Sequence, residues 1–142
     1  MPANLVSLLY VSQATHSLPE GEHPVEAIVR TSVPRNASLG VTGALAFTGS
    51  HFAQVLEGPA ASIDELMASI LADPRHRNVE IVSRTALQQR RFANWSLAYA
   101  GPSMFVDRHI RPLIEGRGQQ AVRAEQLIDL MRRFAADQPA MR

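Results

Sequence analysis

The sequence predicts an α+β fold, a ferredoxin-like βαββαββ sandwich followed by two extra C-terminal helices. Short runs rich in aliphatic and β-branched residues alternate with segments in which apolar residues recur at helical spacing. Proline, glycine and asparagine mark the boundaries between these segments. With 142 residues, 46% of them hydrophobic, the chain is long enough for one domain with a substantial core.

The first strand and the first helix come from the opening part of the chain. The run LVSLLYV at 5–11 is too short for a helix, and its composition predicts a central strand. A helix is expected to begin at Pro24, because proline suits the first helical turn. Pro34 and Asn36 are expected to break this helix. One side of it is formed by Val25, Ile28, Val29 and Ser32.

The next two segments predict a hairpin. VTGALAFTGS at 41–50 ends in a Gly-Ser turn, and HFAQVLEG at 51–58 follows at once. Because side chains alternate along a strand, Gln54 shares a face with Phe52 and Leu56. A buried amide without partners would cost roughly 1–3 kcal/mol, so we expect the fold to supply partners for Gln54.

The segment SIDELMASILADP predicts the second helix. Ser62 and Glu65 form a capping-box pattern, apolar residues follow at helical spacing, and Pro74 ends the run. NVEIVSRTAL at 78–87 and WSLAYA at 95–100 predict the last two strands. The result is a mixed sheet with the first two helices on one face.

Two more helices are expected between about residues 104 and 136, separated by EGRGQ. Their apolar sides must cover something, and the free sheet face is available, either in this chain or in a partner. We therefore expect residues 1–101 to form the main domain and 102–142 to form a helical extension that packs on the sheet within the same structural unit.

Composition excludes several classes of site. The chain has no cysteine, which excludes disulfides, thiolate metal sites and a cysteine nucleophile. We expect no metal, since no ligand spacing joins the histidines at 16, 23, 51, 76 and 109. The arginine-rich stretches PRHRN and QQRR lack interleaved aromatic residues, which favours a solvated surface over a nucleic-acid site. No signal peptide or long apolar run occurs, so we expect a cytoplasmic protein without a membrane partner.

Unusual polar or aromatic residues lie at the ends or in the middle of the predicted elements. Ser12, Ser32 and Ser96 lack the context of a catalytic nucleophile. The other such residues are Tyr10, Asn36, Gln54 and Trp95. Taken singly, each has a structural explanation, such as a strand-edge tyrosine or a core tryptophan. Taken together, they could offer donors and acceptors to a planar heterocycle.

The order of LVSLLYVSQA, RNASLGVTGAL, FAQVLEG, DPRH and RRFANWS resembles the BLUF family over about residues 5–101. BLUF domains are blue-light sensors that use a flavin. The resemblance implies noncovalent FAD or FMN between the first two helices, with Ile28 and Ile70 against the two faces of the ring. It also implies the same ferredoxin-like fold that the pattern predicts.

The resemblance also implies roles for individual residues. Tyr10 would be the photochemical electron donor, and Gln54 would bridge it to the N5/O4 edge of the flavin. Asn36 would bind the pyrimidine edge, and Trp95 would be the aromatic residue whose position relative to Gln54 changes with light. Polar contacts to the ring and ribityl chain would come from Asp73, Arg75 and His76.

The implied chemistry is a hydrogen-bond switch. Excited flavin takes an electron from Tyr10, then a proton through Gln54, and their return leaves Gln54 rotated or tautomerised with a stronger bond to O4. The absorption then shifts to the red. The sequence departs from the family pattern at Leu97, Arg35 and Ser69, which bears on cofactor contacts and signalling.

These features predict a stand-alone photoreceptor that is not an enzyme. Its signal would pass to a separate downstream protein or through homo-oligomers, by way of the sheet face or the C-terminal helices. Candidate contact residues are Phe105, Leu113, Leu127 and Phe134. The first alternative is an acylphosphatase-like hydrolase in which Arg35 holds phosphate and Asn36 positions water. The second is an interaction module that has lost its flavin.

Overall fold

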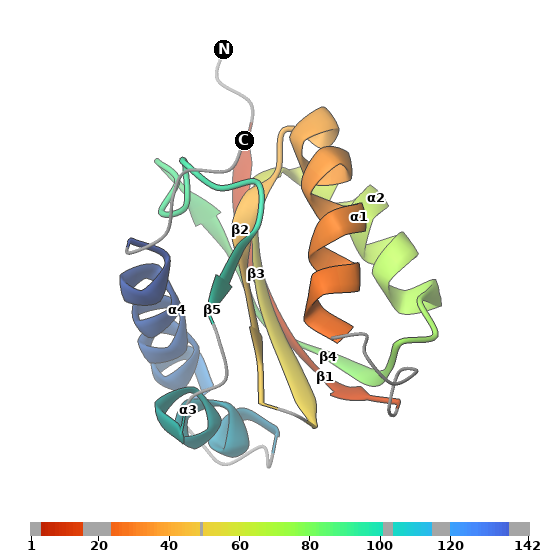
Figure 1. Ribbon diagram of the computed structural model, residues 1–142. Coiled ribbons are helices and arrows are strands. Elements are labelled where there is room, and N and C mark those ends of the chain that lie inside the picture. The colour runs from red at the N-terminus through yellow and green to blue at the C-terminus, as the bar shows by residue number, and fades with distance from the viewer. Residues whose placement is uncertain (1–3, 16–23, 49, 101–103, 115–119, 137–142) are drawn as a thin grey trace.

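The structure is a computed structural model that describes residues 4–15, 24–48, 50–100, 104–114 and 120–136. Figure 1 shows three layers, with α1 and α2 on one face of a sheet and α3 and α4 on the other. The described elements are β1 (Leu5–Ala14), α1 (Pro24–Leu39), β2 (Thr42–Phe47), β3 (His51–Pro59), α2 (Ala60–Ala72), β4 (His76–Leu87), β5 (Ala98–Ala100), α3 (Met104–Ile114) and α4 (Gln120–Ala136).

The sheet has the strand order β4-β1-β3-β2-β5. All neighbouring strands run antiparallel except β2 and β5, which are parallel. This confirms the predicted α+β sandwich and its mixed sheet. β1 and β3 lie side by side in the middle, and their register places Tyr10 directly opposite Gln54.

The face of the sheet under α1 and α2 holds one part of the core. Leu8 and Tyr10 of β1 and Leu56 of β3 pack with Ile63 and Leu66 of α2. These side chains alternate along each strand, as the period of two requires.

The opposite face carries the intervening residues, and α3 and α4 of this same chain cover it. Leu9, Val11, Ala53 and Val55 from the sheet lie in one buried cluster with Ile110, Leu113, Leu127 and Met131 from these helices. Leu113 and Leu127, which the sequence suggested as contacts for a partner, are 0% exposed and belong to the core. Phe134 is partly buried against the cluster, and the side chain of Phe105 lies outside the described residues.

The first helix is longer than predicted. Pro34 lies inside α1 and is exposed, so the expectation that Pro34 and Asn36 break the helix was wrong. The helix ends one turn later at Gly40, which has a φ of 70°. The Gly40 N–H bonds to the Ala37 carbonyl and the Val41 N–H to the Asn36 carbonyl, the pattern of a Schellman C-cap. Tertiary packing of α1 therefore outweighs the hydrogen bond lost at Pro34.

Two further boundaries differ from the prediction. α2 begins at Ala60 after Pro59, and no side chain caps it, so Ser62 and Glu65 lie inside the helix and form no capping box. β5 is only three residues long and does not include Trp95. The Trp95 carbonyl accepts a hydrogen bond from the Gly43 N–H, which fixes the segment before β5 against β2.

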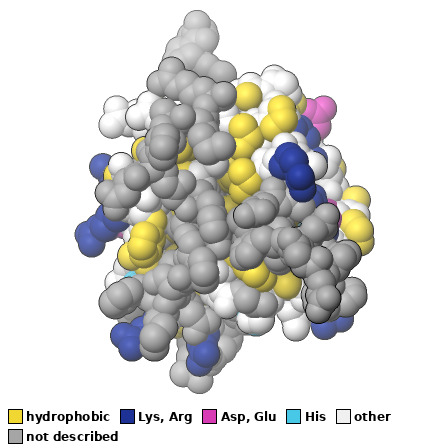
Figure 2. All heavy atoms as spheres, viewed as in Figure 1, with side chains coloured by type: hydrophobic (Ala, Val, Ile, Leu, Met, Phe, Trp, Pro, Cys, Tyr) yellow, Lys and Arg dark blue, Asp and Glu magenta, His cyan; other side chains and the backbone are white. Residues whose placement is uncertain are grey.

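On the face shown in Figure 2, the basic side chains lie in separate groups rather than in one continuous field. All of them are arginines, because the sequence contains no lysine. None of the helices in the described part of the chain combines the length and the apolar character needed to cross a membrane.

Candidate functional site

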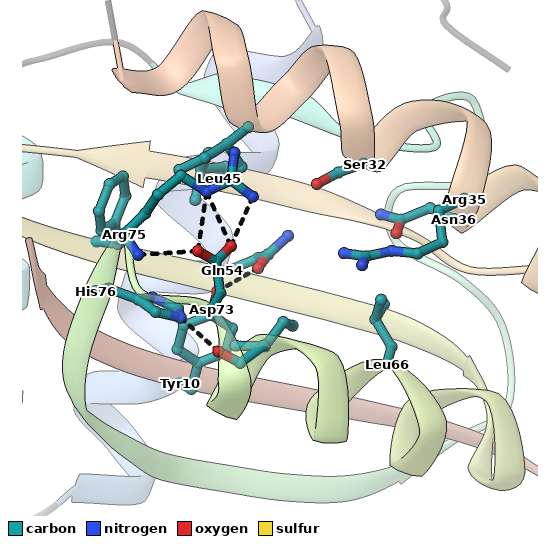
Figure 3. A pocket seen from close by; sticks show the side chains of 13 residues that line it. Tyr10, Ser32, Arg35, Asn36, Leu45, Gln54, Leu66, Asp73, Arg75 and His76 are labelled. Atoms are coloured by element: carbon teal, nitrogen blue, oxygen red, sulfur yellow. Dashed lines mark hydrogen bonds and ion pairs between the residues drawn. The ribbon is translucent and has the colours of Figure 1, made fainter. Parts of the chain in front are cut away.

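A narrow cleft, partly open to solvent, lies between α1, α2 and the sheet. All eight residues predicted to bind a cofactor line it: Tyr10, Ile28, Asn36, Gln54, Ile70, Asp73, Arg75 and His76. Figure 3 shows these residues converging from both helices and from the sheet.

Tyr10 and Gln54 form a buried hydrogen-bonded pair on the floor of the cleft. The Tyr10 hydroxyl donates to Oε1 of Gln54, and the two side chains come from directly opposed positions of β1 and β3. They are only 3% and 4% exposed. Since the amide oxygen accepts from Tyr10, the Gln54 amide nitrogen is the end left to donate into the cleft.

The environment of Tyr10 keeps its phenol protonated. Burial raises the pKa of Tyr10, the negative charge of Asp73 raises it further, and the positive charges of Arg35 and Arg75 only partly oppose this. A neutral phenol that already donates a hydrogen bond can release its proton along that bond when its electron is removed.

Asn36 projects from α1 toward the cleft and is fully buried. Its Nδ2 donates to the Ser96 carbonyl at 2.9 Å. Its Oδ1 is buried and has no hydrogen-bond partner. A buried acceptor without a partner is costly, so this atom calls for a donor from a bound molecule.

Asp73 and Arg75 form an ion pair at the edge of the cleft, with 2.6 Å between Arg75 Nη2 and Asp73 Oδ2. Partial burial of Asp73 favours a higher pKa, but the side-chain and backbone hydrogen bonds from Arg75 outweigh it, and the pKa of Asp73 is lowered. Arg35 also lines the cleft, from α1, and forms no ion pair with any other residue that the structure describes.

His76 lines the cleft but uses both ring nitrogens within the protein. Nε2 lies 2.8 Å from the Ile70 carbonyl, and Nδ1 lies 2.8 Å from Ser12 Oγ. The ring packs edge-on against Tyr10 and Phe52. His76 therefore ties the end of α2, which carries Ile70, to β1 two residues after Tyr10.

The structure does not bring Trp95 into the cleft. Trp95 packs on the opposite side of the sheet, against the cluster that includes Leu130 and Phe134 of α4. Leu97 is buried on the cleft side instead, beside Leu45 and Phe52.

Several lining residues were not predicted as site residues: Ser32, Arg35, Leu45, Phe52 and Leu66. The spacing along a helix or a strand could have identified some of them, because they share a face with predicted site residues. Ser32 lies one helical turn from both Ile28 and Asn36, Leu66 one turn from Ile70, and Phe52 two strand positions from Gln54. Within the described ranges, no acidic and histidine side chains cluster in a way that could hold a metal ion.

The chain is similar in sequence to known proteins. The family model for BLUF, described as sensors of blue light using FAD, matches residues 5–98. The photoactivated adenylate cyclase subunit beta of Euglena longa is 39% identical over 103 residues, which are 72% of this chain and 12% of that protein. The chain thus spans about an eighth of the length of this curated relative.

Solved structures show the same relationship. The dark-state structure of BlrB, a BLUF protein, superposes with a TM-score of 0.74 at 29% identity, covering 97% of this chain and 100% of that one. Klebsiella pneumoniae BlrP1, solved with FMN and cyclic diGMP, has a TM-score of 0.65 at 28% identity over 94% of this chain and 35% of that one.

Proposed function

Since this chain belongs to the BLUF family of blue-light sensors that use FAD, we propose that Tyr10 and Gln54 are its photoactive pair. The chain is a flavin-binding blue-light photoreceptor. The observation that carries the residue assignment is the buried hydrogen bond from Tyr10 to Gln54 on the floor of the cleft.

The polar groups of the cleft fit a flavin. The unpartnered Oδ1 of Asn36 is an acceptor for the imide N–H of the ring, and the amide nitrogen of Gln54 is a donor for the N5/O4 edge. Ile28 from α1 and Ile70 from α2 offer apolar surfaces to the two faces of a flat ring. Arg35 beside Asn36 would donate to a ring carbonyl, and Asp73, Arg75 and His76 would contact the ring and the ribityl chain of FAD or FMN.

When bound, the flavin supplies blue-light absorption and, once excited, a strong oxidant. Tyr10 would give an electron to the excited flavin, and its phenolic proton would move to the Gln54 amide along the existing hydrogen bond. When electron and proton return, Gln54 would remain rotated or tautomerised, because an amide has distinct donor and acceptor ends. Gln54 would then present a different hydrogen bond to the cofactor, which would shift the absorption to the red.

The output of this sensor is a change in protein contacts. We propose that the chain has no catalytic activity of its own and passes its signal, in the cytoplasm, to a separate partner protein or through homo-oligomers. Residues 1–101 would form the flavin-binding domain, and 102–142 the helical extension of the same unit. Covering of one sheet face by α3 and α4 supports this arrangement.

The hydrolase alternative is not supported. The family model and the relatives instead show a family of blue-light sensors. The alternative of a module without flavin is not supported either, because the cleft retains an unpartnered buried acceptor.

Absorption spectroscopy tests the proposal directly. Purified protein loaded with FAD is expected to be yellow and to show a red shift under blue light that reverses in the dark. The Tyr10→Phe variant should bind flavin and lack the shift. Colourless protein that hydrolyses an acyl phosphate would contradict the proposal, as would a full shift in Tyr10→Phe.

A further inference from the structure

A second hollow, of about 360 Å³ and open to solvent, lies between α4 and the loop that joins β4 to β5. Trp95 and Arg91 of the loop form one wall. The α4 wall consists of Asp129, Arg132, Arg133 and Ala136. Arg132, Arg133 and Ala136 follow Asp129 by three, four and seven residues, so the four side chains lie on one side of the helix. We call this hollow the Trp95 groove. α4 lies beside β5, on the side of the sheet away from α1 and α2 (Figure 1).

The lining of the Trp95 groove is basic. It holds three guanidinium groups and one carboxylate. Arg91 pairs with Glu125 at 2.7 Å, and Arg133 pairs with Asp129 at 3.0 Å. The second pair is weak, because its side chains are 77% and 52% exposed. Arg132 is exposed and forms no ion pair with any described residue, so the open end of the groove carries excess positive charge.

The groove also offers an aromatic surface. Trp95 is only partly buried against the core cluster and lines the groove with the rest of its side chain. A partly buried tryptophan bordered by arginines is a combination that anchors protein contacts. Its complement is an apolar or aromatic side chain flanked by carboxylates.

The loop wall of the groove is connected to the flavin cleft by hydrogen bonds. The Ser96 carbonyl accepts from Nδ2 of Asn36, whose other amide atom is the unpartnered acceptor of the cleft. The Trp95 carbonyl accepts from the Gly43 N–H of β2. Any change in the orientation of the Asn36 amide therefore acts on the backbone that carries Trp95.

We infer that the Trp95 groove is the docking site for an acidic segment of a partner protein. Carboxylates of that segment face Arg132 and Arg133, and an apolar side chain of it packs on Trp95. The inference rests on the proposed function. A light-driven change at the flavin would alter the hydrogen bond between Asn36 and Ser96, shift the neighbouring Trp95 and so change the affinity of the groove for the acidic segment.

A binding measurement on the full chain loaded with FAD tests this inference. The probe is a short peptide in which glutamates flank one phenylalanine, labelled with a dye excited by red light, which flavin does not absorb, and a peptide with lysines in place of the glutamates is its control. Fluorescence anisotropy is recorded in the dark and under blue light. We expect the acidic peptide to bind, the basic peptide not to bind, and the affinity to change severalfold on illumination.

Variants assign the binding to the groove. Arg132→Gln with Arg133→Gln should weaken binding about tenfold, because two charge contacts are lost. Arg84→Gln is the matched control, since Arg84 is also a surface arginine but pairs with Asp64 of α2 on the opposite face. Circular dichroism checks that α4 stays helical in the double variant.

The inference is overturned if the two peptides bind alike, if neither binds, if the double variant binds as well as Arg84→Gln, or if light has no effect on binding. It is also overturned if, without peptide, the double variant loses a dimer that the wild type forms, since a second copy would then occupy the groove. A normal red shift in all these variants shows that the photoreceptor function stands independently.

Discussion

At the scale of single residues, the site depends on one cross-strand pair. A glutamine on an otherwise apolar strand face needs a partner, and the register of β1 and β3 supplies Tyr10 directly opposite. Strand alternation in the sequence predicts the inward direction of Gln54. It does not predict the partner, because register depends on how strands far apart in sequence pair. The identity of Tyr10 as that partner came from the family resemblance.

The burial of Tyr10 predicts that its phenol resists ionisation at alkaline pH. Its pKa lies above the value of 10 expected in an unfolded chain. Tyr10 should therefore stay protonated at pH 10, and the stability that depends on its neutral form is lost only as the pH rises beyond that value. Ultraviolet absorption of tyrosinate measures this.

The comparison for that titration is Tyr10→Phe, which leaves Tyr99 as the other of the two tyrosines in the sequence. At pH 10 the folded wild type and this variant should give the same tyrosinate signal. An additional signal from the wild type, with the protein still folded, would contradict the assignment of Tyr10 as a buried neutral donor.

At the scale of elements, the loop between β4 and β5 is held by a carboxylate that is 0% exposed, that of Glu57 on β3. Oε1 accepts from the Phe92 N–H at 2.8 Å and from Thr42 Oγ1 at 3.1 Å, and Oε2 accepts from the Arg91 N–H at 2.8 Å. These bonds anchor the start of the loop that leads to Trp95.

Replacing Glu57 should destabilise the protein. In Glu57→Gln the amide nitrogen faces a backbone donor, so at least one buried N–H is left unsatisfied, at a cost of about 2–3 kcal/mol. Glu125→Gln is the matched control, because Glu125 is 56% exposed and binds the same arginine, Arg91. Its cost should stay below about 1 kcal/mol. Equal losses of unfolding free energy in urea would contradict this role for Glu57.

Sequence patterns located the elements better than their ends. Composition and periodicity predicted each strand and helix that the structure describes, yet Pro34 did not end α1 and Ser62 did not cap α2. In each case tertiary contacts outweigh a local preference. The buried role of Glu57 was also missed, since its backbone donors come from Arg91 and Phe92, more than thirty positions along the chain.

At the scale of the whole molecule, one sheet separates two sets of helices with different tasks. α1 and α2 border the cleft that we propose as the flavin site, while α3 and α4 cover the other face and α4 borders the Trp95 groove. The sequence analysis expects residues 102–142 to pack on the sheet, and α3 and α4 lie on this second face. The predicted site residues line one cleft because motifs from distant segments meet at the centre of one sheet.

Buried clusters lie on both faces of the sheet, and the C-terminal helices supply part of one of them. We therefore expect these helices to be part of the folding unit. Deleting residues 104–142 would expose Leu9, Val11, Ala53 and Val55, so we expect aggregation or loss of cooperative unfolding. Deleting only 137–142 serves as the control and should leave the melting temperature nearly unchanged. A monomeric protein that lacks 104–142 and melts like the full chain would contradict the single unit.

The central claim is that Gln54 links Tyr10 to the flavin and that its hydrogen bonds to the flavin change in the light. The light-minus-dark absorption spectrum of FAD-loaded Gln54→Leu tests it most directly, because leucine keeps the size of the side chain and removes its donor and acceptor. The account predicts that this variant binds flavin and shows no reversible red shift under light that fully converts the wild type. A reversible shift equal to that of the wild type would contradict it.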